Sequence, residues 1–184
     1  MSPLLDALYH GRRDEADRLL TERGAESLTI HEAAAMGVVA RIEQLIGDDP
    51  AAVNSFALDG FQPLGLAAFF GRRDAAELLL EGGGDVNMPS RNAQGVTALH
   101  AALSSPDPSF AIALVGGGAD VNARQASGVT PLHETAYNGD LDLTRFLLEH
   151  GADPTARYGQ GRTPAEYARE RGHAAVAEQL ESPR

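Results

Sequence analysis

The stretch TPLHETAYNGDLDLTRFLLEHGADPT, residues 130–155, contains two short segments that each end at or just before a glycine. The first segment starts with Thr130-Pro131, which suits a helix start because threonine caps free N–H groups and proline fits the first helical position. The second segment, residues 140–150, has apolar residues at helical spacing, and a glycine commonly follows a helix. The stretch therefore predicts a helix, a tight turn and a second helix.

The same pattern recurs along the whole chain. Matching first segments begin at residues 2, 28, 62, 97, 130 and 163. From residue 28 onward they lie 34, 35, 33 and 33 residues apart, whereas the first interval is only 26 residues. A stretch with a polar residue before glycine, such as Ser127-Gly128, separates most pairs and predicts a turn or short hairpin. A period of this length indicates stacked units, none of which buries its apolar face alone.

These repeated segments resemble the ankyrin repeat, which has a period of 33 residues and the motif T-P-L-H-x-A. Two copies lie close to that pattern: Thr130-Pro131-Leu132-His133 with Gly151-Ala152-Asp153, and Thr97-Ala98-Leu99-His100 with Gly118-Ala119-Asp120. The resemblance covers essentially the whole chain and implies an all-α solenoid of stacked helix-turn-helix units with hairpin or turn fingers. It implies one domain over residues 1–184, with approximate units at 1–24 (N-terminal cap), 25–57, 58–92, 93–125, 126–158 and 159–184 (C-terminal cap).

Two places depart from the repeated pattern. The finger that contains Met88-Pro89-Ser90 has two more residues than the next one, which predicts a longer loop. In the fourth unit, residues 104–108 replace the usual glycine turn. Asp107 as N-cap and Pro108 at the first helical position are still expected to start the second helix there.

The composition excludes several classes of function. The formal net charge is -11, which argues against a general nucleic-acid binder and against a polybasic membrane-surface protein. The chain has no cysteine for disulfides or thiolate metal sites, and all 15 of its basic residues are arginine. No run of 18 apolar residues and no secretory signal are visible. We expect a soluble cytoplasmic protein, and the lysine-free, alanine-rich composition favours a bacterial source.

The histidines do not form a recognisable catalytic or metal site. His31, His100 and His133 share one position of the repeated pattern, where the resemblance implies a structural role within and between units. The zinc motif H-E-x-x-H fails because Ala35 and Tyr137 stand where a second histidine is needed. We therefore expect no catalytic residues, no metal and no cofactor, and the chain is predicted not to be an enzyme.

The resemblance implies that partners bind the concave face, which the first helices and the finger tips form. Transfer of the partner-facing positions to this chain gives an apolar group centred on one unit, with acidic neighbours: Leu58, Phe61, Phe69, Phe70, Met36, Tyr9, Tyr137, Asn138, Glu32 and Glu134. Exposed aromatic clusters are typical of interfaces, and the acidic residues favour a basic partner. The alternative is that Phe69 or Phe70 packs between units.

The sequence therefore predicts a non-enzymatic protein–protein interaction module that binds a protein partner, as yet unidentified, through its concave face. A narrower alternative is a specific inhibitor, immunity protein or accessory factor of one bacterial enzyme. We expect a monomer that binds neither nucleic acid nor membrane. Self-association through the phenylalanines is the competing possibility.

Overall fold

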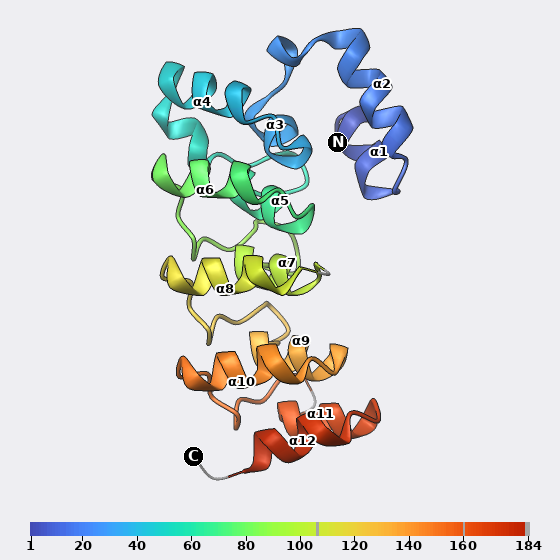
Figure 1. Cartoon of the computed structure of the whole chain (residues 1–184), viewed down its shortest axis with the longest axis vertical. Coiled ribbons are helices and arrows are strands. Elements are labelled where there is room, and N and C mark those ends of the chain that lie inside the picture. The colour runs from blue at the N-terminus through green and yellow to red at the C-terminus, as the bar shows by residue number, and fades with distance from the viewer. Residues whose placement is uncertain (106, 160, 183–184) are drawn as a thin grey trace.

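Short helices stack in pairs along one axis (Figure 1). The computed structural model describes residues 1–105, 107–159 and 161–182, so the expected C-terminal unit at 159–184 is described only in part. The first helices of the pairs are α1 (Pro3–Tyr9), α3 (Ile30–Met36), α5 (Pro63–Phe69), α7 (Ala98–Leu103), α9 (Pro131–Asn138) and α11 (Pro164–Glu170). The second helices are α2 (Arg13–Arg23), α4 (Val39–Asp48), α6 (Arg73–Glu81), α8 (Pro108–Gly116), α10 (Leu141–Glu149) and α12 (Ala174–Glu181).

Two 3-10 turns, η1 (Ala25–Ser27) and η2 (Pro50–Asn54), complete the regular structure. Within the described ranges there is no strand, only an isolated bridge between Tyr158 and Arg162, so the predicted all-α solenoid is confirmed. No helix in these ranges has both the length and the apolar character needed to cross a membrane.

The helices begin and end where their local sequence predicts. The side chain of Thr163 caps α11 by accepting a hydrogen bond from the backbone N–H of Glu166. The side chain of Glu166 in turn accepts a hydrogen bond from the backbone N–H of Thr163. Asp107 caps α8 through the N–H of Ser109 (2.9 Å), with Pro108 at the first helical position as expected. Gly139 ends α9 at φ 74°, a left-handed conformation that glycine adopts without steric cost.

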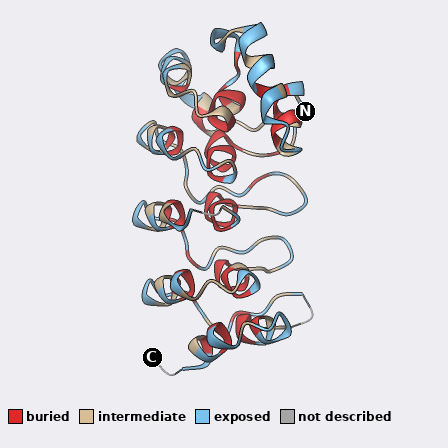
Figure 2. Cartoon of the chain, turned by 45° about the vertical axis from the view of Figure 1, so that its right-hand side comes forward, coloured by how far each residue is buried: buried red, intermediate tan, exposed pale blue. Residues whose placement is uncertain are grey.

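The core lies between the two columns of helices (Figure 2). The first helices contribute small side chains that allow close packing, such as Ala67, Ala68 and Ala136, all fully buried. Most second helices contribute one fully buried aliphatic residue that faces the first column: Ile42, Leu79, Leu114 and Leu147. No helix pair encloses this surface by itself, so the stability of each unit depends on its neighbours.

A ladder of asparagine side chains joins neighbouring units. The side-chain amide of Asn122 donates to the carbonyl of Gly151 (3.0 Å), and its oxygen accepts from the N–H of Asp153 (2.8 Å). Asn54 and Asn87 make the same pair of bonds to the units that follow them. Each asparagine therefore satisfies backbone groups just beyond the second helix of the next unit. We call these three residues the asparagine ladder.

The finger loops precede the first helices and are also bonded to one another. The N–H groups of Arg91, Ala126 and Gly159 donate to carbonyls of Gly60, Gln94 and Ser127 in the preceding finger (2.8–3.1 Å). The long finger is held by Gln62, whose buried amide donates to the carbonyls of Met88 (3.0 Å) and Pro89 (2.9 Å). The long finger is thus anchored on Gln62, the residue that immediately precedes α5.

The N-terminal pair packs differently from the others. Helices α4, α6, α8, α10 and α12 form one column, but α2 lies outside that column, together with α1 beside the first helices at the right of the stack (Figure 1). It packs on α1 and next to η1 and makes no substantial contact with α4. Helix α1 packs against α3, and its Tyr9 contacts Phe69 and the finger residue Asp59, so the first pair sits against the first helices and fingers of the following units.

Removal of one member of the asparagine ladder should loosen the stack. Asn122→Ala deletes both bonds to the next unit and is expected to lower the free energy of unfolding by about 1–2 kcal/mol. Urea unfolding followed by circular dichroism measures this loss. The matched control is Gln94→Ala, a finger residue with a solvent-exposed amide, which should cost less than about 0.5 kcal/mol. Equal losses in the two variants would contradict a role for the ladder.

Candidate functional site

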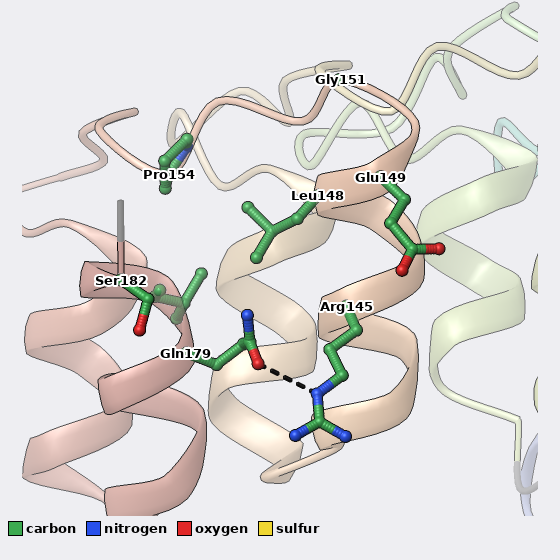
Figure 3. A pocket seen from close by; sticks show the side chains of 8 residues that line it. Arg145, Leu148, Glu149, Gly151, Pro154, Gln179 and Ser182 are labelled. Carbon is green, nitrogen blue, oxygen red and sulfur yellow. Dashed lines mark hydrogen bonds between the residues drawn. The ribbon is translucent and has the colours of Figure 1, made fainter. Parts of the chain in front are cut away.

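A wide hollow of about 630 Å³ lies between the second helices α10 and α12, away from the fingers (Figure 3). Leu148, Leu180 and Pro154 form its apolar part. Its arginine, Arg145, already donates to the side chain of Gln179 (2.9 Å). None of the residues predicted to bind a partner lies here.

On the concave face, helix α1 covers part of the predicted phenylalanine group. The ring of Tyr9 packs against the rings of Phe69 and Phe70, with centroids 5.7 and 5.3 Å apart. Its hydroxyl donates to Asp59 in the finger of the same unit as the phenylalanines (3.0 Å). Burial and the neighbouring Asp59 carboxylate both raise the pKa of Tyr9. Tyr9 is therefore not an open part of the predicted apolar group, because its ring covers the rings of Phe69 and Phe70.

The remaining apolar candidates divide between core and surface. Phe61, Phe70 and Met36 are half-buried and pack against the hydrophobic core. Phe69 keeps 42% of its surface exposed, and Leu58 at the finger tip is 93% exposed. Both of the sequence-based alternatives are thus found within one group: Phe61 and Phe70 pack partly against the core, whereas Phe69 and Leu58 are exposed to solvent.

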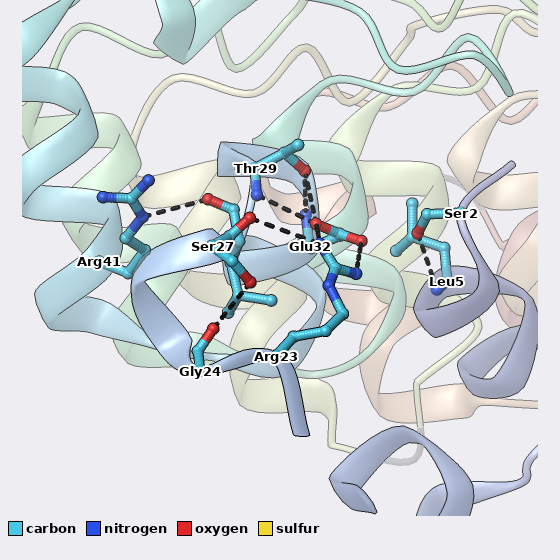
Figure 4. Close-up of polar contacts among 9 residues, drawn as sticks. Ser2, Leu5, Arg23, Gly24, Ser27, Thr29, Glu32 and Arg41 are labelled. Carbon is cyan, nitrogen blue, oxygen red and sulfur yellow. Dashed lines mark hydrogen bonds and ion pairs between the residues drawn. The ribbon is translucent and has the colours of Figure 1, made fainter. Parts of the chain in front are cut away.

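Glu32 is not an exposed acidic neighbour of this group, and the expectation that it is exposed was wrong. It is only 1% exposed, and the guanidinium of Arg23 donates to both of its carboxylate oxygens (2.8 and 3.3 Å; Figure 4). It also accepts from the N–H of Thr29 in a capping box. Burial by itself raises its pKa, but the bonds from Arg23 and Thr29 outweigh burial and hold the pKa below its usual range. The sequence pattern gave no sign of this pair because Arg23 belongs to another unit.

The other half of the concave face is open. A hollow of about 320 Å³ lies between α9, the finger before it, and the facing ends of α7 and α11. Its walls include three predicted residues, Glu134, Tyr137 and Asn138, and three that were not predicted, Ser104, Gln125 and Tyr167. We call it the α9 hollow. Ser104 and Tyr167 occupy repeat positions that face partners in the family pattern, but Gln125 carries no such signal.

Glu134 is the acidic group of the α9 hollow. One of its oxygens accepts from the side-chain amide of Gln125, and the other oxygen has no partner within the described ranges. No arginine of this part of the chain forms an ion pair with it. Burial raises its pKa to about 7, and the bond from Gln125 opposes that rise only in part. The carboxylate is thus held without a counter-charge beside exposed aromatic surface.

Tyrosine rings form the apolar wall of the α9 hollow. Tyr137 is 42% exposed, and its ring lies 5.7 Å from that of Tyr167. Tyr158 packs on the other side of Tyr167, with ring centroids 5.3 Å apart. The guanidinium of Arg171 stacks over the ring of Tyr137 at 4.0 Å, which shows that this ring accepts a planar cation on its face.

The repeated histidines act as links within and between units. In His133, Nδ1 accepts from the N–H of Thr130 (3.2 Å), so Nε2 carries the proton and donates to the carbonyl of Arg162 in the next finger (3.2 Å). His31 bonds the carbonyl of Ser55 in the same way (3.1 Å). Burial lowers the pKa of His100 to about 4, which keeps it neutral. Within the described residues, no three potential metal ligands come together.

The raised pKa of Glu134 has a consequence for stability. A carboxyl group whose pKa rises on folding stabilises the folded state while it is protonated, and this stability is lost as the pH rises from about 4.5 through about 7. Between pH 5 and pH 8 the wild type should therefore lose about 1–2 kcal/mol more than Glu134→Gln, which carries no charge at either pH. Urea unfolding at both pH values measures the difference. Glu43→Gln, an exposed position on α4, is the control, and a parallel loss in all three proteins would contradict the prediction.

Comparison with known proteins agrees with this architecture. A family model described as ankyrin repeats (3 copies) matches residues 30–125 and, in a second match, residues 104–182. No curated protein matches the chain. Because the two matches together cover most of its length, the chain belongs to the ankyrin-repeat family, whose members generally act as protein–protein interaction modules.

Proposed function

We propose that this chain binds a partner protein through the open half of its concave face, around the α9 hollow. The observation that carries the proposal is the combination of an exposed aromatic ring, Tyr137, with a carboxylate, Glu134, that lacks a counter-charge. Aromatic residues that become buried on binding, next to polar groups that pair with the partner, are typical of the centre of a protein interface. Asn138 and Ser104 supply polar groups at the same hollow.

The charge of the molecule supports a basic partner. The chain has a formal net charge of -11, so its field attracts positively charged surfaces and speeds their approach. The covered half of the face contributes less, because Tyr9 already occupies the surface of Phe70. Leu58 and Phe69 remain exposed beside α1 and would extend the contact area of a long partner.

Two variants with matched exposure separate the concave face from the outer face. Tyr137→Ser removes a 42% exposed aromatic residue of α9, and Ile112→Ser removes a 43% exposed residue of α8 in the other column. Affinity capture from a lysate of the native organism, read by mass spectrometry, should yield a protein that wild type and Ile112→Ser retain. Tyr137→Ser should bind that protein at least tenfold more weakly, which corresponds to about 1.4 kcal/mol or more.

Circular dichroism first establishes that both variants are folded. Retention by Tyr137→Ser together with loss from Ile112→Ser would place the binding surface on the second helices and contradict the proposal. Purified candidate and chain are then titrated at low and high salt. Weaker binding at high salt is expected for an acidic face that meets a basic partner.

A further inference from the structure

Two glutamates hold the same position of the repeated pattern but have different surroundings. Glu32 and Glu134 each follow the repeated histidine, in LTIHEA (28–33) and TPLHET (130–135). Glu32 is closed off by the N-terminal helix pair, whereas Glu134 lines a hollow that is open to solvent. The chain thus contains one version of this position that an arginine occupies and one that no arginine occupies, although only Glu32 closes the capping box of its helix, a place that His133 takes in α9.

The occupied version shows which chemical group this position accepts. Arg23, at the end of α2, reaches the Glu32 carboxylate with two donors, Nη1 at 2.8 Å and Nη2 at 3.3 Å. The second nitrogen also approaches the carbonyl of Ser27 (3.4 Å). Helix α2 is part of the pair that lies beside the first helices of the stack (Figure 1). An arginine from a helix outside the regular stack is therefore the natural counter-ion of this position.

In the structure, none of the described arginines fills the unoccupied version. Within the described part of the C-terminal half, every arginine is engaged elsewhere: Arg124 with the carbonyl of Arg157, Arg145 with Gln179, Arg157 with Gly161, Arg162 with Glu170, Arg169 with Glu181 and Arg171 with the ring of Tyr137. None of these arginines pairs with Glu134, which leaves its free oxygen available to a cation of another molecule.

The walls of the α9 hollow suit a planar cation with several donors. Tyr137 and Tyr167 present aromatic rings, and stacked guanidinium on Tyr137 is already seen with Arg171. Asn138 uses its amide nitrogen on the carbonyl of Leu103 (3.2 Å), so its side-chain oxygen remains an acceptor. The free oxygen of Glu134, the oxygen of Asn138 and the hydroxyl of Ser104 give acceptors at one hollow.

We propose that the α9 hollow receives an arginine side chain of the partner protein, which pairs with Glu134 as Arg23 pairs with Glu32. The inference rests on the proposed function and names the residue type that the concave face recognises. Arginine fits better than lysine because its five N–H donors reach a carboxylate and neighbouring oxygens at once, and its flat face stacks on tyrosine. Burial raises the pKa of Glu134 to about 7, and pairing with a guanidinium would lower that pKa again.

A small probe tests the hollow without the partner. N-acetyl-arginine N-methylamide is titrated into the folded chain at pH 8, and the tyrosine ring and glutamine amide signals are followed by NMR. Because the chain has only four tyrosines, the rings of Tyr137 and Tyr167 can be assigned by substitution. Saturable shifts at Tyr137, Tyr167 and Gln125 are expected, with a Kd in the millimolar range.

Three comparisons decide the outcome. The citrulline analogue has the same shape without the charge and should bind at least tenfold more weakly, and the lysine analogue should also bind more weakly than the arginine probe. Glu134→Gln should weaken arginine binding at least tenfold, while Glu43→Gln on α4 leaves it unchanged. No saturable shift, equal binding of the citrulline or lysine analogue, or unchanged binding by Glu134→Gln would overturn the proposal. Failure here leaves the Tyr137→Ser and Ile112→Ser comparison as a separate test of partner binding.

Discussion

The stack depends on hydrogen bonds that cross from one unit to the next. A helix pair of this size leaves one face apolar and several helix-end carbonyls without partners, so it is not stable by itself. Asn54, Asn87 and Asn122 each satisfy backbone groups of the following unit, and the histidines His31 and His133 do the same at the fingers. These bonds fix the distance and rotation between units, and the alanine-rich first helices then pack closely.

The N-terminal pair is placed elsewhere because it lacks these links. Helix α2 is followed directly by Gly24 and η1, with no ladder asparagine and no finger, as the short 26-residue interval already indicates. Nothing therefore ties α2 to the column of second helices. The apolar side of α1 (Leu4, Leu5 and Leu8) is buried against the first helices and fingers instead, and Arg23 becomes the counter-ion of a buried glutamate.

Local sequence was sufficient for the features that depend on neighbours within one repeat. The capping by Thr163 and Asp107 and the proline starts follow from residue type and spacing, and the structure has them as expected. The environments of Glu32 and Tyr9 could not be predicted in this way, because each depends on contacts with another unit whose placement the repeated pattern does not describe. The same limit applies to Gln125, a finger residue whose role appears only when α9 is beside it.

The concave face is consequently divided into a part that the N-terminal helix pair covers and a part that the chain leaves open. In the first part the chain supplies its own ligand, since Tyr9 covers Phe70 and Arg23 neutralises Glu32. In the second part Tyr137 is exposed and Glu134 lines an open hollow, where partial burial of its carboxyl group has a cost that no internal charge offsets. Under the proposal, a guanidinium of the partner offsets this cost when it binds. The geometry of the covered half thus serves as a guide to what the open half binds.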